Sequence, residues 1–473
     1  MINAHVRHTL LLGVCAFLFI LSGCSVLPSQ GGTQPVRTTP LTLPPSTPTP
    51  RATGTDSPVS VNDWTTYHQN NARTGLVANA PDPHRLNRAW SKQLDGAVYA
   101  EPLVVKGRLI VATEGDSLYS LNVDTGEVLW RTNVGTPVPQ STLPCGDIDP
   151  LGITGTPVYD PATNLVFAVA EVQGPGHILV GVDAGSGQVR VRRVIDIAAM
   201  EPAVHQQRAA LALSQNRVYV AYGGLDGDCG NYHGTVVASR TDGTGPLLSY
   251  QLPTPREGGI WAASGPAVDE AGNIYVAVGN GSTTQGAWDK TDSVLRLSPT
   301  LQLEDGFAPT QWPQDNAADA DLGSMGPILL PNGLIFIAGK SGFGYLLHAD
   351  KLGGVGGQAV VTDVCHSYGG AAALGSQVFV PCTEGVLEVT VGPGASLHLG
   401  WQAPSQVTGS PIVGGHTVYT LDTGGTLYAL DAANGNVRAT LSVGATSRFA
   451  SPTLSGNKVF VGTLNGVVAA TIS

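Results

Sequence analysis

From residue 64 onward, apolar and polar residues alternate in short runs that are separated by turns containing glycine. The clearest copy is DSLYSLNVDTGEVLW at residues 116–130, and a second is GTLYALDAANGNV at residues 425–437. Alternation with a period of two on both sides of such a turn predicts a pair of antiparallel strands. Weaker copies recur along the chain. The third residues of the copies are Leu118, Ile178, Val236, Val294, Leu346, Leu387, Leu427 and Val468.

These copies are spaced by about 40 to 60 residues, which is the range found for the blades of β-propellers. Two further strand-like runs precede each copy, for example at residues 101–114 and 409–422. Four antiparallel strands make one blade. The sequence therefore predicts an all-β protein whose residues 61–473 form one eight-bladed propeller of four-stranded antiparallel blades.

The ends of the repeat region predict how the ring closes. The last copy stops at Ser473 without a fourth strand, while residues 86–94, LNRAWSKQL, have the end of a repeat without its beginning. Pairing the two would complete the eighth blade and remove two open sheet edges. We therefore expect an N-terminal strand to close the ring.

The first 60 residues resemble an export signal and a tether, and we do not expect them to form part of the hydrophobic core. Arg7 and the apolar run at residues 9–21 have the layout of a secretory signal, and Leu21-Ser22-Gly23-Cys24 resembles a bacterial lipobox, in which the cysteine receives the lipid. An uncleaved anchor helix is the alternative. Residues 25–60 are rich in proline and threonine and predict a disordered tether. We expect a signal peptide over residues 1–24, lipidation of Cys24 and a place outside the cytoplasm, on the cell membrane or envelope.

Four cysteines follow Cys24: Cys145, Cys229, Cys365 and Cys382. An even number in an oxidising compartment suggests two disulfides, for which three pairings exist, and four free buried thiols are the alternative. In a four-stranded blade, the loop that enters the first strand and the loop between the second and third strands lie on the same face. This topology favours Cys365–Cys382 within one blade and Cys145–Cys229 between two insertions.

The charge of the chain limits its partners. The formal net charge is -11, and no cluster of Lys and Arg suits the neutralisation of phosphates, so we expect no nucleic-acid partner. No P-loop is present, no G-x-S-x-G motif lies between a strand and a helix, and no histidine spacing supports zinc. We expect a monomer that binds a ligand or a protein partner at a mouth of the channel.

The repeat motif has LYALD followed by TG and LW, and it resembles the pyrroloquinoline quinone (PQQ) propeller repeat of the quinoprotein alcohol dehydrogenase-like superfamily. The resemblance extends over residues 64–473. The resemblance implies that a tryptophan at the end of a repeat docks on a neighbouring blade. Trp90 and Trp130 match that position, and Trp401 matches it loosely. The same repeat occurs in dehydrogenases and in non-catalytic lipoproteins that bind other proteins.

Three segments look like stretches of quinoprotein alcohol dehydrogenases, especially those that act on polyvinyl alcohol: residues 258–280, 319–330 and 338–347. The resemblance implies PQQ and Ca²⁺ as cofactors. It places Asp228, Asn280 and Asp319 on the metal, Asn280 and Lys340 in cofactor binding with Lys340 on the quinone, and the catalytic base at Asp319. Hard oxygen ligands of this kind suit Ca²⁺.

Two departures separate the chain from those enzymes. Cys229 stands alone where they carry two adjacent cysteines, and the tryptophan under the quinone has no clear match. Aspartate and asparagine beside glycine are also common turn formers. The first expectation is therefore a lipid-anchored scaffold for envelope proteins or a small ligand, and the alternative is a PQQ- and Ca²⁺-dependent dehydrogenase that oxidises an alcohol or sugar.

Overall fold

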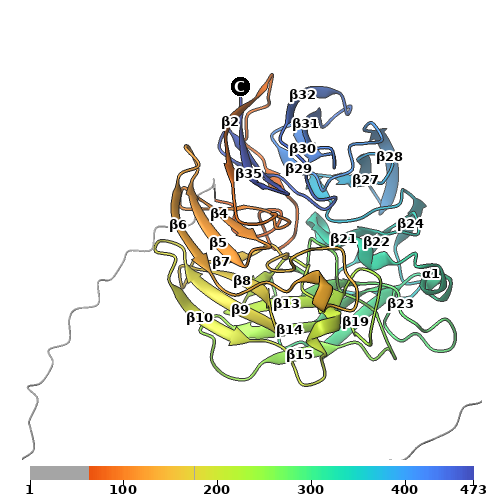
Figure 1. The fold of residues 1–473 in the computed structure, drawn as a ribbon. Coiled ribbons are helices and arrows are strands. Elements are labelled where there is room, and N and C mark those ends of the chain that lie inside the picture. The colour runs from red at the N-terminus through yellow and green to blue at the C-terminus, as the bar shows by residue number, and fades with distance from the viewer. Residues whose placement is uncertain (1–62, 175) are drawn as a thin grey trace, which may run out of the picture. The chain divides into compact units, whose positions relative to one another are not determined.

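The computed structural model describes residues 63–174 and 176–473, so the predictions for the signal, the tether and Cys24 lie outside the described residues. The described chain forms eight antiparallel sheets of four principal strands each (Figure 1). The predicted eight-bladed propeller is confirmed. In the described ranges, no helix is both long enough and apolar enough to span a membrane.

Each blade runs from an inner strand to an outer strand, and the repeated residue of the sequence pattern lies in the third strand of every blade. Blades 1 and 2 contain β3 (Leu103–Val105), β4 (Arg108–Thr113), β5 (Ser117–Asn122), β6 (Val128–Asn133), β7 (Val158–Asp160), β8 (Leu165–Val172), β9 (Gly176–Asp183) and β10 (Val189–Val194). Blades 3 and 4 contain β12 (Ala212–Ser214), β13 (Arg217–Gly224), β14 (Thr235–Arg240), β15 (Leu248–Gln251), β16 (Ala267–Val268), β17 (Ile274–Val278), β18 (Ser293–Leu297) and β19 (Leu303–Ala308).

The second half of the ring repeats this order. Blades 5 and 6 contain β20 (Ile328–Leu330), β21 (Leu334–Ala338), β22 (Phe343–His348), β24 (Val360–Asp363), β25 (Ala372–Leu374), β26 (Gln377–Val380), β27 (Leu387–Gly392) and β28 (Ser396–Gln402). Blades 7 and 8 contain β29 (Ile412–Gly414), β30 (Thr417–Leu421), β31 (Thr426–Asp431), β32 (Val437–Ser442), β33 (Thr453–Ser455), β34 (Lys458–Thr463), β35 (Gly466–Ile472) and β2 (Leu86–Gln93).

A few short elements lie outside this pattern. Three two-residue strands extend blades 7, 3 and 4, and the helices lie in the connections. These elements are β1 (Leu76–Val77), β11 (His205–Gln206), β23 (Gly354–Val355), α1 (Trp312–Ala318) and the 3₁₀ helices at Gln140–Thr142, Pro202–Val204, Leu322–Ser324 and Pro331–Gly333. We call the face that carries the loops between second and third strands, and the connections between blades, the loop face.

The ring closes as the sequence predicts. Strand β2 pairs antiparallel with β35, from Leu86 opposite Ile472 to Gln93 opposite Gly466, and the two lie side by side in Figure 1. The chain therefore completes its eighth blade with a strand from the beginning of the repeat region, and the closure removes the two open sheet edges that an incomplete ring would leave.

Tryptophans in outer strands hold neighbouring blades together. The indole N–H groups of Trp90, Trp130 and Trp401 donate to backbone carbonyl groups at 3.2, 3.1 and 2.9 Å. Each ring lies on a glycine of the adjacent turn, and a Cβ atom at Gly126, Gly187 or Gly435 would come within 2.5–2.8 Å of ring atoms. The docking that the repeat resemblance implies is thus present at three blade junctions.

Apolar side chains of facing sheets form the core between the blades. One large cluster joins blades 1, 2, 7 and 8 and includes Val111, Tyr159, Tyr419 and Phe460, all essentially inaccessible to solvent. A second cluster joins blades 4, 5 and 6. Each sheet therefore buries both of its faces. For this reason, the buried strands consist of consecutive apolar residues.

A segment that the sequence pattern did not assign fills the centre of the ring. Residues 64–77, here called the plug, contact the inner strand of every blade or the loop that enters it. Backbone hydrogen bonds join the plug to Val104, Tyr159, Val268, Leu329, Ala373 and Val413, and side chains join it to Leu211 and Ser451. One short peptide therefore ties all eight blades together.

Buried polar groups hold the plug in place. The guanidinium of Arg73 is 1% exposed and donates to Oγ1 of Thr66 and to the carbonyl groups of Tyr67, Leu211 and Pro266, at 2.8–3.0 Å. Beside it, the carboxyl of Glu101 accepts the backbone N–H of His68 at 2.8 Å. Burial raises the pKa of Glu101 to about 8 and lowers the pKa of His68 to about 3. Both groups are therefore largely neutral at pH 7.

A buried ion-pair cluster in blade 2 gives a pH-dependent contribution to stability. Nδ1 of His177 lies 2.6 Å from Oδ1 of Asp196, and Nε2 lies 3.6 Å from Oε2 of Glu171. Burial by itself lowers the pKa of His177, but the hydrogen bonds and charges of the two carboxylates outweigh it and raise the pKa to about 10. Folding thus favours the imidazolium over the neutral ring.

The stability that His177 contributes should be complete below its unfolded pKa of 6.5 and should disappear as the pH rises through about 10. We expect the Tm of the wild type to fall across this window more steeply than the Tm of His177→Gln, measured by circular dichroism. His398→Gln, at an exposed histidine, is the control and should follow the wild type. Parallel curves for wild type and His177→Gln would contradict the assignment.

Candidate functional site

The loop face contains a cavity of about 470 Å³, here called the loop-face pocket, over the centre of the ring. This volume lies within the range of about 300–1,000 Å³ that ligand sites in proteins occupy. All four residues that the sequence analysis placed on a cofactor or metal line it, namely Asp228, Asn280, Asp319 and Lys340. The structure therefore brings the predicted site residues together in one cavity.

Loops from blades 3, 4 and 5 place these side chains, with Asp228 in the loop between β13 and β14. Asn280 follows β17, and Lys340 follows β21, so both lie in loops between second and third strands. Asp319 ends α1 with a left-handed φ of +53°. The loop of Lys340 packs on the loop of Asp321 because Gly339 has no side chain, and a Cβ atom there would lie 2.6 Å from Cα of Leu322.

Lys340 connects two carboxylates of this pocket. Its Nζ lies 2.8 Å from Oδ1 of Asp319 and 2.8 Å from Oδ2 of Asp321, and its backbone N–H donates to the carbonyl of Asp321 at 3.0 Å. Burial alone would lower the pKa of the ammonium, but the two carboxylates raise it well above its ordinary value. Lys340 is therefore a fixed positive charge in the pocket.

Asp321 and Asp319 differ in their surroundings. The side chain of Asp319 is 64% exposed, while that of Asp321 is fully buried. Burial raises the pKa of Asp321 to about 6, although Lys340 lowers it. Within the described residues, Oδ1 of Asp321 has no hydrogen-bond partner. A buried carboxylate of raised pKa beside a cavity is what a general base requires, so Asp321 suits this role better than Asp319.

The calcium ligands predicted from the resemblance have other partners here. Oδ1 of Asp228 accepts a hydrogen bond from the hydroxyl of Tyr232 at 2.5 Å, and Oδ1 of Asp319 accepts one from Lys340. Among residues 63–174 and 176–473, no group of three or more His, Cys, Asp or Glu side chains could hold a metal ion. Calcium at Asp228, Asn280 and Asp319 therefore stays a prediction.

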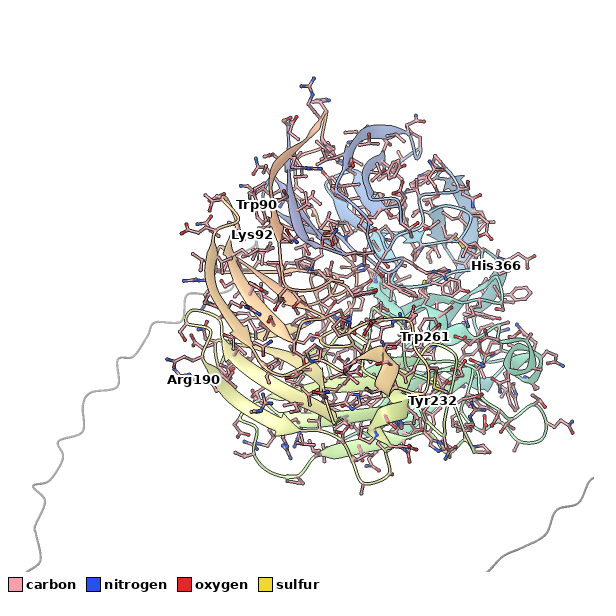
Figure 2. The ribbon with its side chains drawn as sticks, viewed as in Figure 1. Trp90, Lys92, Arg190, Tyr232, Trp261 and His366 are labelled. Atoms are coloured by element: carbon pink, nitrogen blue, oxygen red, sulfur yellow. A yellow bond between two sulfur atoms is a disulfide. The ribbon has the colours of Figure 1, made fainter. Side chains whose placement is uncertain are left out.

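An aromatic wall completes the pocket, and the sequence analysis did not find it. Trp261 lies 6.4 Å from Tyr368 and 6.2 Å from Phe449 between ring centroids (Figure 2 labels Trp261). Trp261 was missed because it does not end a repeat. Its signal in the sequence is the Gly258-Gly259 pair before it, since these glycines allow the chain to pass close to blade 3.

Three cations lie against this wall. Arg448 is 3.8 Å from the centroid of Tyr368, Arg208 is 4.4 Å from that of Phe449, and Nζ of Lys340 is 5.5 Å from that of Trp261. Burial lowers the pKa of Arg208, while nearby aspartates such as Asp147 oppose this shift. The lining of the pocket thus combines flat aromatic surface with three cationic side chains and five aspartates.

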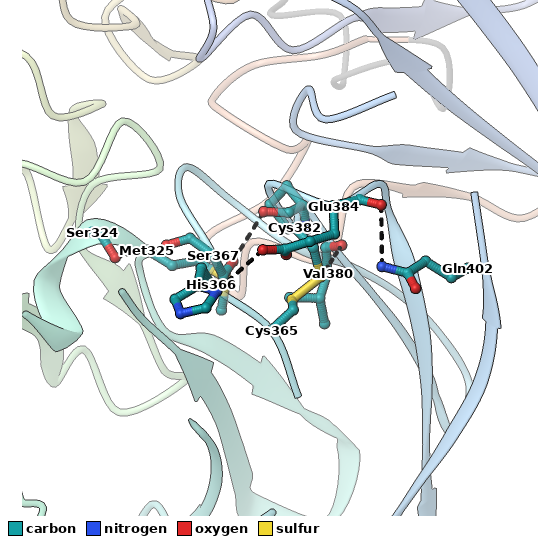
Figure 3. The surroundings of a disulfide bond; sticks show 10 residues. Ser324, Met325, Cys365, His366, Ser367, Val380, Cys382, Glu384 and Gln402 are labelled. Carbon is teal, nitrogen blue, oxygen red and sulfur yellow. Dashed lines mark hydrogen bonds and ion pairs between the residues drawn. A yellow bond between two sulfur atoms is a disulfide. The ribbon is translucent and has the colours of Figure 1, made fainter. Parts of the chain in front are cut away.

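Both predicted disulfides are present on the loop face. Cys145 and Cys229 are joined with Cα atoms 6.1 Å apart, and Cys365 and Cys382 with Cα atoms 5.6 Å apart. The pairings favoured by blade topology are confirmed, and Figure 3 shows the second of them. Because Asp228 adjoins Cys229 and lines the pocket, the first disulfide fixes the rim of the pocket.

Comparisons with known proteins agree with this fold. The family PQQ_2, described as outer membrane protein assembly factor BamB, matches residues 87–224 and 396–473. Polyvinylalcohol dehydrogenase of Sphingopyxis sp. (strain 113P3) is 25% identical over 290 residues, which are 55% of this chain and 41% of that protein. The chain thus spans less than half the length of this relative.

Solved structures share the propeller at low sequence identity. A quinohemoprotein alcohol dehydrogenase from Pseudomonas putida HK5 has a TM-score of 0.69 at 13% identity, covering 87% of this chain and 80% of that one. One from Comamonas testosteroni has 0.66 at 16%, with the same coverages. BamB from Moraxella catarrhalis has 0.59 at 14%, covering 82% and 100%. The repeats and the eight-bladed ring therefore resemble those of PQQ-like repeat β-propellers, and the family match covers less than half of the chain.

Proposed function

We propose that the chain is a lipid-anchored propeller outside the cytoplasm that binds a small, flat, anionic ligand in the loop-face pocket, with PQQ as the leading candidate. The observation that carries the proposal is the aromatic wall of Trp261, Tyr368 and Phe449 with three cationic side chains against it. Aromatic rings bind flat molecules by stacking, and guanidinium groups pair with carboxylates.

PQQ fits this pocket by its chemistry. It is a planar, fused-ring quinone with three carboxylates, so its faces suit Trp261 and its charges suit Arg208, Lys340 and Arg448. The free Oδ1 of the buried Asp321 also requires a partner that the described protein does not supply. A bound molecule with a polar edge at this point would satisfy it.

Oxidation of an alcohol is the second candidate, and Asp321 is the observation that favours it. Bound PQQ would supply the oxidant. In this chain, Asp321 would accept the proton of the substrate hydroxyl, Lys340 would hold Asp321 in position, and Trp261 would exclude water from one side of the ligand. The similarity to a polyvinylalcohol dehydrogenase supports this candidate.

The match to the BamB family supports a scaffold role for the same face, with envelope proteins as partners. The propeller loops and the rim of the pocket would then contact the partner. Anchoring through Cys24 is part of the proposal. Recovery of the wild type but not of Cys24→Ser in the membrane fraction would support it, and equal recovery of both would oppose it.

Titration of the purified full-length chain with PQQ, followed by calorimetry and by tryptophan fluorescence, tests the ligand. We expect saturable binding that Trp261→Leu weakens by about tenfold, because aromatic stacking contributes about 0.5–1.5 kcal/mol. Trp288→Leu, outside the pocket, is the matched control. Absence of PQQ binding by the wild type, with and without Ca²⁺, would overturn the proposal.

Dye-linked turnover of an alcohol panel separates the two candidates. Turnover that Asp321→Asn abolishes while PQQ binding persists would establish the dehydrogenase. Binding without turnover would leave the binding function alone.

A further inference from the structure

A cavity of about 920 Å³ lies on the face of the ring opposite to the loop face. Its lining includes the turn between β16 and β17, the turn between β20 and β21, and residues at the end of β22. In an antiparallel blade, these turns lie at the other end of the strands from the loops that define the loop face. The cavity, here called the turn-face groove, therefore lies between blades 4 and 5, and it shares no residue with the loop-face pocket.

The plug forms the inner end of this groove. Ala72 and Thr74 are both lining residues. The carbonyl groups of Asn71 and Ala72 accept the backbone N–H groups of Val268 and Leu329 at 2.8 and 3.0 Å. Main-chain hydrogen bonds thus join the plug to the inner strands of blades 4 and 5. The walls of the groove are fixed before a ligand arrives, which lowers the cost of binding.

The deep part of the groove is apolar. Val268 is 4% exposed and Leu330 is 9% exposed, and the half-buried Leu329, Leu334 and Ala349 also line the cavity. Binding removes such surface from water, and this burial is the main favourable contribution to most associations of proteins. The deep part of the groove therefore suits apolar side chains.

The outer rim of the groove is acidic. Glu270 and Asp350 are exposed, and the half-buried Asp269 precedes Glu270. The guanidinium of Arg296 lines the groove too, but it already donates to the carbonyl of Asp350 at 2.9 Å. Among the described lining residues, the exposed His348 is the only other basic group. Three carboxylates against one arginine attract a cationic ligand.

An extended basic peptide matches this arrangement. Successive side chains of a β-strand point to opposite sides. A peptide in which apolar residues alternate with Lys or Arg would place its apolar side chains on Val268 and Leu330, and its cations toward Glu270 and Asp350. A small amine would cover only part of the groove, whose volume is near the upper end of the range of about 300–1,000 Å³ for ligand sites.

We infer that the turn-face groove binds an extended segment of a partner protein in which apolar residues alternate with lysine or arginine. The inference goes beyond the function proposed for the loop-face pocket, because it concerns the other face and other residues. A protein held at the turn-face groove leaves the loop-face pocket open to its ligand.

Fluorescence anisotropy of labelled hexapeptides, titrated with the purified full-length chain, tests the inference. The probes are Leu-Lys-Val-Lys-Leu-Lys, the acidic peptide Leu-Glu-Val-Glu-Leu-Glu and the polar peptide Ser-Lys-Ser-Lys-Ser-Lys. We expect the first to bind at least about tenfold more tightly than either of the others, because it alone combines apolar contact with opposite charge.

Charge reversal at the rim provides the matched variants. Glu270→Lys/Asp350→Lys should weaken binding of the basic, apolar peptide by about tenfold and strengthen binding of the acidic peptide, because attraction becomes repulsion at two points. Both side chains are exposed, so the variant should keep the Tm of the wild type. Glu127→Lys/Asp363→Lys, at two exposed carboxylates outside the groove, should bind the peptides like the wild type.

Absence of peptide binding, or equal affinity of the wild type for the basic, apolar peptide and the acidic peptide, would overturn the inference. Unchanged affinities in Glu270→Lys/Asp350→Lys would do the same. Competition with hexylamine separates a peptide site from a site for small cations. We expect displacement of the peptide to need at least about a hundredfold higher concentration of hexylamine, because the amine fills less of the groove. Displacement at a comparable concentration would show a small-amine site and reject the peptide.

Discussion

Replacing Lys340 by methionine is expected to lower the free energy of unfolding by about 3 kcal/mol at pH 8. The substitution removes the only ion-pair partner that the described structure shows for the fully buried Asp321. A buried carboxylate without a counter-charge is costly as an anion, so Asp321 should take up a proton instead. The measurement is chemical denaturation at pH 8 and at pH 5.

The pH dependence identifies the cause. The pKa of Asp321 is about 6 with Lys340 present and rises further without it, so at pH 5 the carboxyl is largely neutral and the loss should be smaller. Adding Asp321→Asn to Lys340→Met should restore most of the stability at pH 8. Lys340→Met should also weaken PQQ binding.

A matched control comes from Lys458, which is 19% exposed like Lys340 but pairs with Asp124, which is 69% exposed. Lys458→Met should cost less than about 1 kcal/mol, because water can solvate the remaining carboxylate. An equal loss in both lysine variants, or an equal loss for Lys340→Met at pH 5 and pH 8, would contradict the role given to Lys340.

Replacing Arg73 by methionine should lower the free energy of unfolding by about 3–5 kcal/mol, because the buried guanidinium makes four hydrogen bonds to the plug and to blades 3 and 4. Three of the acceptors are backbone carbonyl groups that would lose their donor. Since the plug contacts all blades, we expect a single, less stable unfolding transition in urea and not the loss of one blade.

Arg85→Met, at an arginine whose side chain is exposed, is the control and should leave the transition unchanged. A stable Arg73→Met protein with the wild-type transition would show that the plug contributes little to the ring. Near-ultraviolet circular dichroism would then show whether the environment of the plug residue Tyr67 had changed.

The eight-bladed ring was predictable because the sequence features that define its strands and their connections are local. The alternation around residues such as Leu118 and Leu427 defines strands, the missing fourth strand after Ser473 leaves one pairing for β2, and blade topology orders the cysteines. Strand periodicity extends over a few residues, and the connections between strands follow general rules of topology. All three predictions are confirmed.

The plug and the pocket were less predictable because they depend on contacts between distant residues. The plug has no alternation, and most of its partners are backbone groups that any sequence presents. Asp319 and Asp321 are two residues apart in one loop, and only burial distinguishes them. The place of Trp261 in the aromatic wall depends on its contacts with Tyr368 and Phe449, which come from blades 6 and 8.

The pairing of β2 with β35 also determines when the ring can close during synthesis of the chain. Residues 86–93 are synthesised well before their partner at residues 466–472. At ordinary rates of synthesis, this strand waits on the order of tens of seconds for its neighbour. During that interval its edge is open to pairing with other chains. The ring can close only when residues 466–472 arrive, so the strand needs protection in the nascent chain that the finished ring no longer requires.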